Sequence, residues 1–242
     1  MSRSRILRFL DEVGASSGPS VSLCLPPGLS VQEAEKEIGT RIRVIEKDVL
    51  PALAEAVARS RTGAVIFWGE SHRVLVIPPF PIVSEVLADG YCVAPLRSIL
   101  ERDLLIALIL VRLGDYAIGV FRGEERVSSK VGTGLVHGRH RQGGSSSQRF
   151  ARHREKQMEY FFERVCGHVR EHLEPHVRGL DHVIYGGEEF TLRTFRQQCK
   201  FLKYFDERTL NLRLNVRRPR QSSLEEAISE VWSSELIEWA EA

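Results

Sequence analysis

The strongest constraint on the fold is an unbroken run of eight apolar residues, LLIALILV, at Leu104–Val111. A run of this kind without polar alternation is typical of a β-strand that is buried on both faces. It is far shorter than the ~20 apolar residues needed to span a bilayer. Two β-rich segments, Tyr116–Phe121 and Arg126–Lys130, follow after short glycine turns. We therefore predict a meander of three strands.

Helices and further strands are expected after the meander. A long amphipathic helix is predicted from about Ser146 to just before Pro175, since apolar residues recur on one helical face. That face consists of Met158, Phe161, Phe162, Val165, Val169 and Leu173. The later segments are a strand at His182–Tyr185, a helix at Thr191–Tyr204, a strand at Leu210–Val216 and a helix at Ser223–Ala240. This alternation predicts an α/β (α+β) fold, a mixed β-sheet flanked by helices.

The first part of the chain is predicted to form a smaller N-terminal α/β unit. Its expected elements are a helix over 1–15, a strand at Val21–Leu25, a helix at Val31–Ser60 and a hairpin of Ala64–Trp68 with Arg73–Ile77. Ser30 is a plausible N-cap of the second helix, and Pro51 is expected to break or kink it. A length of 242 residues suits one or two domains. We place a first domain at 1–103 and a second at 104–242.

Composition excludes several classes of protein. With 43% hydrophobic and 27% charged residues, the chain resembles ordinary globular proteins rather than disordered ones. The four cysteines form no CxxC pair, which disfavours a zinc ribbon or a thioredoxin-like site. The N-terminus lacks the apolar core of a secretory signal. We expect a cytoplasmic protein with reduced thiols, no membrane association and no cofactor.

A short histidine motif is the only candidate for a metal site. His168–His172 reads HVREH, which fits the HxxEH pattern of inverted zinc proteases. The pattern is short and the helix is rich in charge, so a solvated helix face is the favoured interpretation, and no metal is expected. A free-standing metallohydrolase that uses His168 and His172 is the alternative, and bound zinc in the purified protein would reveal it.

Residues 128–148 carry almost no side chains that can pack. The segment holds five glycines and five serines, and such a long loop usually has a functional reason. Seven basic residues and no acidic one lie between Arg126 and Arg154, whereas the whole chain carries +2, which leaves −5 for the remainder. A flexible basic strip of this kind suits a polyanionic partner. A solvated Gly/Ser linker would have a similar composition.

The adjacent glycines Gly143 and Gly144 add a second requirement to this loop. They let the backbone approach a ligand closely, and exposed N–H groups at such a point can hold an oxyanion. The sequence that includes them, GRHRQGGSSSQRFARHREKQ at 138–157, resembles the middle-domain signature GRGGQSxxRFAR of eukaryotic and archaeal class I release factors. The matching positions are Gly138, Arg139, Gly143, Gly144, Ser146, Arg149, Phe150, Ala151 and Arg152.

The resemblance covers roughly residues 104–240 and includes VIYGGEEFTLRTF at 183–195. It is most similar to the bacterial branch akin to the Vms-like (ANKZF-type) peptidyl-tRNA hydrolases of ribosome quality control. In that family the loop tip enters the peptidyl transferase centre of the large ribosomal subunit. There it promotes hydrolysis of the ester that joins the nascent peptide to tRNA. The implied partners are therefore the ribosome, its rRNA and peptidyl-tRNA.

The sequence departs from the family pattern where the glutamine should follow the two glycines. Ser145 occupies that position, so a backbone N–H is retained for charge stabilisation but the side-chain amide is lost. Gln148 or Gln142 could supply the amide if the loop is re-registered, and we assign water placement to Gln148. Otherwise Gln148 is only a residue of the helix N-terminus.

The remaining expectations concern RNA contacts and the type of activity. Phe150 is expected to anchor the helix start in the core. The residues expected to contact RNA are Arg139, His140, Arg141, Arg149, Arg152 and Arg154. Codon-reading motifs of the NIKS type are absent from 1–103, so a codon-independent peptidyl-tRNA hydrolase of ribosome rescue is favoured. The alternative is a catalytically inactive adaptor that binds the ribosome or tRNA and has lost the glutamine.

Overall fold

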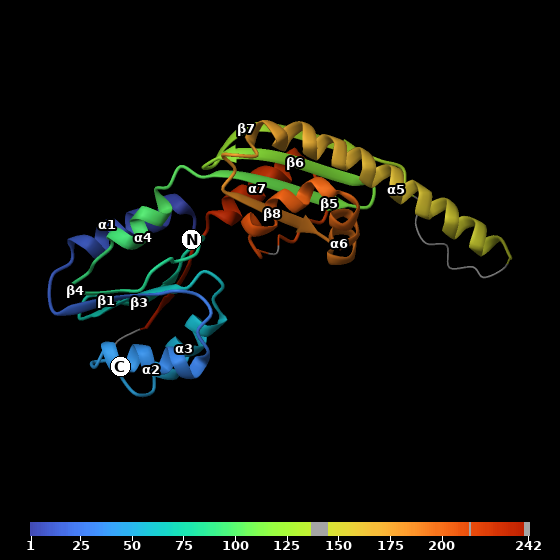
Figure 1. Ribbon diagram of the computed structural model, residues 1–242. Coiled ribbons are helices and arrows are strands. Elements are labelled where there is room, and N and C mark those ends of the chain that lie inside the picture. Colours follow the sequence, from blue (N-terminus) through green and yellow to red (C-terminus); the bar gives the residue numbers. More distant parts are fainter. Residues whose placement is uncertain (137–144, 213, 240–242) are drawn as a thin grey trace. The chain divides into compact units, whose positions relative to one another are not determined.

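The computed structural model describes residues 1–136, 145–212 and 214–239, which form two compact units. The first unit consists of Met1–Arg102 together with Ser229–Ala242, and the second of Asp103–Ile228 (Figure 1). The prediction places the second domain at 104–242, and the second unit begins at Asp103. The C-terminal residues, however, make their contacts with the first unit, and the chain passes between the units within its last helix.

The first unit is built on an antiparallel sheet of the order β4-β1-β2-β3-β9. Its strands are β1 (Ser20–Leu25), β2 (Ala64–Gly69), β3 (Arg73–Ile77), β4 (Val86–Asp89) and β9 (Glu235–Glu238). Its helices are α1 (Arg3–Ala15), α2 (Val31–Arg41), α3 (Leu50–Arg59) and α4 (Ala94–Leu100). The predicted first helix, first strand and hairpin are thereby confirmed.

Two helix predictions in this unit need correction. The segment expected as one helix at Val31–Ser60 forms α2 and α3, which are separated by residues 42–49. Ser30 caps α2 in a capping box with Glu33, and Pro51 lies in the first turn of α3, where a missing N–H costs nothing. The helix predicted to reach Ala240 ends at Val231, because the residues beyond it pair with β3 as strand β9.

The second unit contains the predicted mixed sheet, in the order β7-β6-β5-β8. Its strands are β5 (Leu105–Arg112), β6 (Asp115–Arg122), β7 (Glu125–Thr133) and β8 (His182–Gly187), with β5 and β8 parallel. Every residue from Leu105 to Val111 is buried. The predicted meander and the strand buried on both faces are confirmed.

Helices cover both faces of this sheet. On one face lie α5 (Ser145–Leu173), α6 (Glu189–Gln198) and the 3-10 segment η2 (Lys200–Arg208), and the short turn η1 (Glu174–His176) follows α5. On the other face lies α7 (Gln221–Val231), whose Leu224 approaches Gly119 of β6. The predicted helix over Thr191–Tyr204 therefore forms two elements, α6 and η2.

The predicted strand at Leu210–Val216 is not present as such. Two isolated β-bridges connect this region to β8. Thr209, just before the segment, pairs with Val183, and Leu214 pairs with Gly186. Leu214 and Val216 are buried whereas Asn211 and Asn215 are exposed. The segment is thus held mainly by side-chain packing rather than by a continuous hydrogen-bond ladder.

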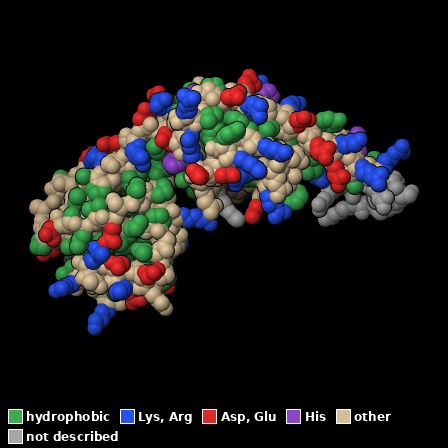
Figure 2. Space-filling model, in the orientation of Figure 1, with side chains coloured by type: hydrophobic (Ala, Val, Ile, Leu, Met, Phe, Trp, Pro, Cys, Tyr) green, Lys and Arg blue, Asp and Glu red, His purple; other side chains and the backbone are tan. Residues whose placement is uncertain are grey.

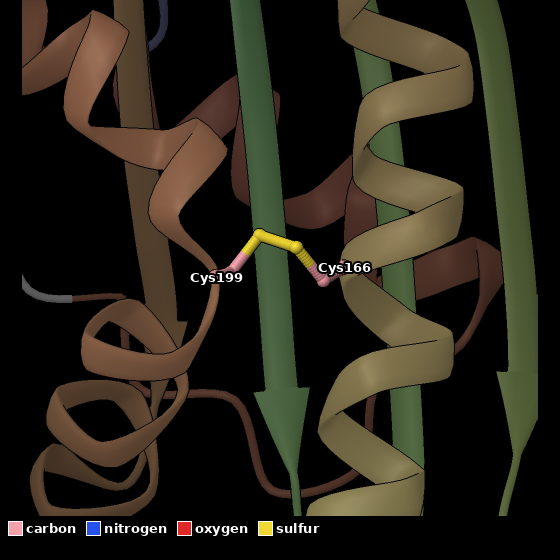
Figure 3. The surroundings of a disulfide bond; sticks show 2 residues. All are labelled: Cys166 and Cys199. Atoms are coloured by element: carbon pink, nitrogen blue, oxygen red, sulfur yellow. A yellow bond between two sulfur atoms is a disulfide. The ribbon is translucent and has the colours of Figure 1, made fainter.

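A disulfide joins two helical segments of the second unit, contrary to the expectation of reduced thiols. Cys166 of α5 and Cys199 at the end of α6 have Cα atoms 5.4 Å apart (Figure 3). They are separated by 33 residues in sequence, so no local spacing motif reveals the pair. The two helices cover the same face of the sheet, and this packing brings the sulfur atoms together. Cys24 and Cys92 are free thiols.

Among the described helices, none combines the length and the apolar character that crossing a membrane requires.

Candidate functional site

The connection between β7 and α5 carries the glycine pair. It is shorter than the predicted loop at 128–148, because Ser128–Thr133 belongs to β7 and residues 145–148 form the first turn of α5. Residues 137–144 lie outside the described part of the chain. The candidate residues Arg139, His140, Arg141, Gly143 and Gly144 are among them.

The start of this connection is fixed against the middle of α5. The Gly134 N–H donates a hydrogen bond to the Gly114 carbonyl at 2.7 Å, and the Arg164 guanidinium donates to the Thr133 carbonyl. A Cβ added at Gly134 would lie 2.5 Å from the ring of Phe161. The chain therefore leaves the sheet along a defined path close to α5.

The predicted apolar face of α5 is confirmed, and it shows where the helix meets the sheet. Phe161, Phe162, Val165, Val169 and Leu173 are buried in the core of the second unit, and Met158 is partly buried beside them. From Arg149 to Tyr160, by contrast, none of the described side chains is buried. The segment of α5 from Ser145 to Gln157 therefore extends about 20 Å, at 1.5 Å per residue, before the helix meets the sheet (Figure 1).

Phe150 lies on this projecting segment, so its prediction as a core residue was wrong. Its side chain is 55% exposed. The helix begins more than two turns before the sheet reaches it, so Phe150 lies outside the core of the second unit. An exposed aromatic ring between basic residues suits contact with a nucleobase.

Two of the assigned catalytic residues lie at the N-terminus of α5. Ser145 is its first residue and Gln148 completes the first turn. The first N–H groups of an α-helix have no acceptor within the helix, and the aligned peptide dipoles make this end electropositive. Directly beyond the glycine pair, the fold thus presents backbone donors that favour an anion.

The described basic residues of the candidate site lie along the projecting segment. Arg149 and Arg152 are exposed and Arg154 is half-buried. Glu155 is the single acidic residue of this segment, and in the space-filling view blue basic and red acidic side chains both appear on the surface (Figure 2). Arg217 and Arg218 lie at the end of the sheet where β7 ends. The Arg217 carbonyl accepts a hydrogen bond from Arg112, and Arg218 lies 3.6 Å from Asp115.

The HxxEH motif has local partners in the protein. His168 Nδ1 lies 3.2 Å from Glu171 Oε2, and its ring stacks on Tyr116. His172 Nδ1 lies 3.1 Å from Ser128 Oγ, and burial lowers the pKa of His172. Within the described ranges, no three His, Cys, Asp or Glu side chains gather as a metal site would require.

Gly186 and Gly187 form a tight end of β8. Gly187 has a φ of +131°, and an added Cβ would lie 2.1 Å from the Val111 carbonyl oxygen. Positive φ together with this close approach requires glycine. A structural turn accounts for this pair without a bound phosphate.

Comparison with known proteins gives a consistent family relationship. Residues 105–237 match a family model described as Actinobacteria/chloroflexi VLRF1 release factor. Peptide chain release factor subunit 1 of Archaeoglobus fulgidus is 30% identical over 235 residues, which cover 84% of this chain and 58% of that protein. The protein of the same name from Aeropyrum pernix is 25% identical over 191 residues, covering 68% and 51% respectively.

The chain thus spans little more than half the length of these two relatives. Among solved structures, an archaeal translation termination factor aligns with a TM-score of 0.42 and 18% identity, covering 96% of this chain and 73% of that one. Pelota of Archaeoglobus fulgidus aligns with a TM-score of 0.30 and 12% identity, covering 93% and 60%.

Proposed function

Because this chain belongs to the Actinobacteria/chloroflexi VLRF1 release factor family, we propose that it is a codon-independent peptidyl-tRNA hydrolase. It acts in ribosome rescue or ribosome-associated quality control, in the cytoplasm and without a cofactor. Its partners are the large ribosomal subunit, rRNA and peptidyl-tRNA. The segment around Gly143 and Gly144 enters the peptidyl transferase centre. The family relationship recognised in the sequence supports the role in translation, and the hydrolytic activity is our proposal.

In this mechanism water attacks the carbonyl carbon of the ester between peptide and tRNA. Negative charge develops on the carbonyl oxygen, and the ester bond to the terminal ribose then breaks to give a free peptide and deacylated tRNA. Gly143 and Gly144 allow the backbone to approach the ester, the Ser145 N–H stabilises the oxyanion, and Gln148 positions the water. The protein contributes positioning and fixed dipoles rather than a strong base.

The observation that carries this proposal is the start of α5 at Ser145, directly after the glycine pair. The helix N-terminus supplies N–H donors directly after Gly143 and Gly144, the residue type whose backbone is least restricted by a side chain. The projecting part of α5 then extends about 20 Å from the sheet with exposed Arg149, Phe150 and Arg152. This geometry suits insertion into a narrow, RNA-lined space.

One observation favours a second function, that of a catalytically inactive adaptor. Ser145 stands where the family signature has glutamine. Without an amide from another residue, the chain would bind the ribosome or tRNA without turnover. Both functions need the basic surface, and only the hydrolase needs Gln148.

We expect Gln148→Ala to slow peptide release about 100-fold, comparable to the removal of one positioning or oxyanion group elsewhere. The assay follows labelled peptide released from peptidyl-tRNA on ribosomes. Gln198→Ala is the matched control, since Gln198 is an exposed residue at the end of α6. Release by Gln148→Ala at the wild-type rate would remove Gln148 from the mechanism.

We expect the double substitution Arg149→Gln and Arg152→Gln to weaken ribosome binding and to lower the slope of log K against log salt by about two. Both arginines are exposed on the projecting segment, where each can contact a phosphate. Arg102→Gln with Arg178→Gln removes the same charge from other exposed positions. Equal salt slopes for the two double variants would show that binding depends on net charge rather than on this surface.

A further inference from the structure

A cavity of about 930 Å³ lies in the second unit, between the end of β8, α6, η2 and residues 209–212, 214 and 215. Its size is within the usual range of small-molecule sites. The close turn at Gly187, which a side chain would obstruct, forms part of its wall. Its described lining includes none of the catalytic or RNA-contacting residues assigned above.

The interior of the cavity is apolar, with one buried polar group. Leu192, Leu202 and Leu214 contribute aliphatic surface. Tyr185 is only 7% exposed, and its hydroxyl lies beside the side chains of Thr209 and Arg196 without a hydrogen bond of full geometry to a described residue. Burial raises the pKa of Tyr185 to about 12, so the hydroxyl stays protonated. A buried hydroxyl whose hydrogen bonds are incompletely formed carries a desolvation cost, which a ligand atom can reduce.

Basic and aromatic side chains surround this interior. Arg196 is paired with Asp206 at 3.0 Å and lies over the Tyr185 ring. Arg193 and Lys203 also line the cavity and form no ion pair with a described residue. With Glu189 included, the charged side chains of the described lining residues sum to +1. The Arg193 guanidinium also lies 5.9 Å from the ring of Phe190, which is 53% exposed.

We propose that this cavity binds a nucleotide, with the base against the leucines and the Tyr185 hydroxyl and the phosphate at Arg193 and Lys203. Aliphatic walls suit the face of a heterocyclic base, and Gln197 and Asn215 offer amides to its edge. Basic side chains suit the phosphate. This chemistry is shared by a free nucleotide and by an unpaired nucleotide of RNA.

The position of the cavity favours RNA as the source. Gly187 pairs with Val111 at the end of β5, and Thr133 at the end of β7 pairs with Asp115 of β6. The cavity, beside edge strand β8, and the connection that carries the glycine pair, which follows edge strand β7, therefore lie at the same end of the strands but at opposite edges of the sheet. The choice of RNA rests on the proposed function, whereas the nucleotide site itself does not.

The test uses the full ¹⁵N-labelled chain, titrated with adenosine 5′-monophosphate and separately with a seven-nucleotide single-stranded RNA. We expect shift changes at the amides of Tyr185, Gly187 and Arg193. Arg193→Gln with Lys203→Gln should weaken binding about tenfold, because two phosphate contacts are lost. The control, Arg178→Gln with Lys200→Gln, removes the same charge from exposed positions outside the cavity, and its affinity should change less than twofold.

Tighter binding of the RNA than of the mononucleotide at these amides supports the RNA source, and equal binding supports a free nucleotide. Unchanged cavity amides with both probes, or equal loss of affinity in the two double variants, would overturn the site. RNA-induced shifts confined to Arg149–Arg152 would also overturn it while leaving the proposed function intact. Nucleotide binding here by a protein that releases no peptide would contradict only the proposed function.

Discussion

Gly144→Ala is expected to reduce peptide release at least 100-fold and to leave ribosome binding within about twofold. A methyl group at this position hinders the close approach of the backbone to the ester and displaces the Ser145 N–H, which starts α5. Loss of one donor to a developing oxyanion typically costs a factor of 10² to 10³ in rate. The comparison requires single-turnover release of labelled peptide together with a binding measurement on the same ribosomes.

Gly167→Ala provides the matched control within the same helix. Gly167 lies in the part of α5 that packs on the sheet, and an added Cβ would meet nothing within 4 Å. Alanine in a helix interior is favoured over glycine by roughly 0.5–1 kcal/mol, so this variant should be slightly more stable and fully active. Equal release by both glycine variants would exclude the glycine pair from the chemistry.

Reduction of the disulfide is expected to lower the unfolding temperature of the second unit by roughly 10 °C. The disulfide spans 33 residues, and a crosslink of that length stabilises the folded state by roughly 3–4 kcal/mol through restriction of the unfolded chain. It joins α5, which carries the proposed catalytic turn, to the end of α6. Thermal unfolding should be followed with and without dithiothreitol.

The double variant Cys166→Ala with Cys199→Ala should unfold near the temperature of the reduced wild type and should not respond to reductant. Cys92→Ala, which alters a free thiol of the first unit, should keep the wild-type response. An unchanged unfolding temperature after complete reduction, verified by thiol titration, would contradict a stabilising role for the crosslink.

Short-range patterns predicted most of the second unit. The apolar run at Leu104–Val111 and the helical periodicity from Met158 to Leu173 both follow from local burial, and both are confirmed. The strand β9 was missed, because Leu236 and Ile237 become a strand only by pairing with β3, more than 150 residues earlier. The pairing of Cys166 with Cys199 likewise depends on the packing of two helices on one sheet face.

The sequence motif identified the family, whereas the surroundings of the candidate site were less predictable. The RFAR-containing motif led to the release factor family, which the family model supports. The exposure of Phe150 was not predictable, since an apolar residue on an amphipathic helix is normally buried and nothing local marks where the sheet ends. The cavity beside Tyr185 was missed for a related reason, because its walls come from separate elements that only the fold brings together.

The most direct test of the central claim is peptide release by the wild-type chain from peptidyl-tRNA, on ribosomes without a stop codon and on isolated large subunits. A codon-independent hydrolase should release labelled peptide in both preparations, leaving deacylated tRNA. Salt-sensitive binding to the ribosome without any release would contradict the hydrolase and support the inactive adaptor.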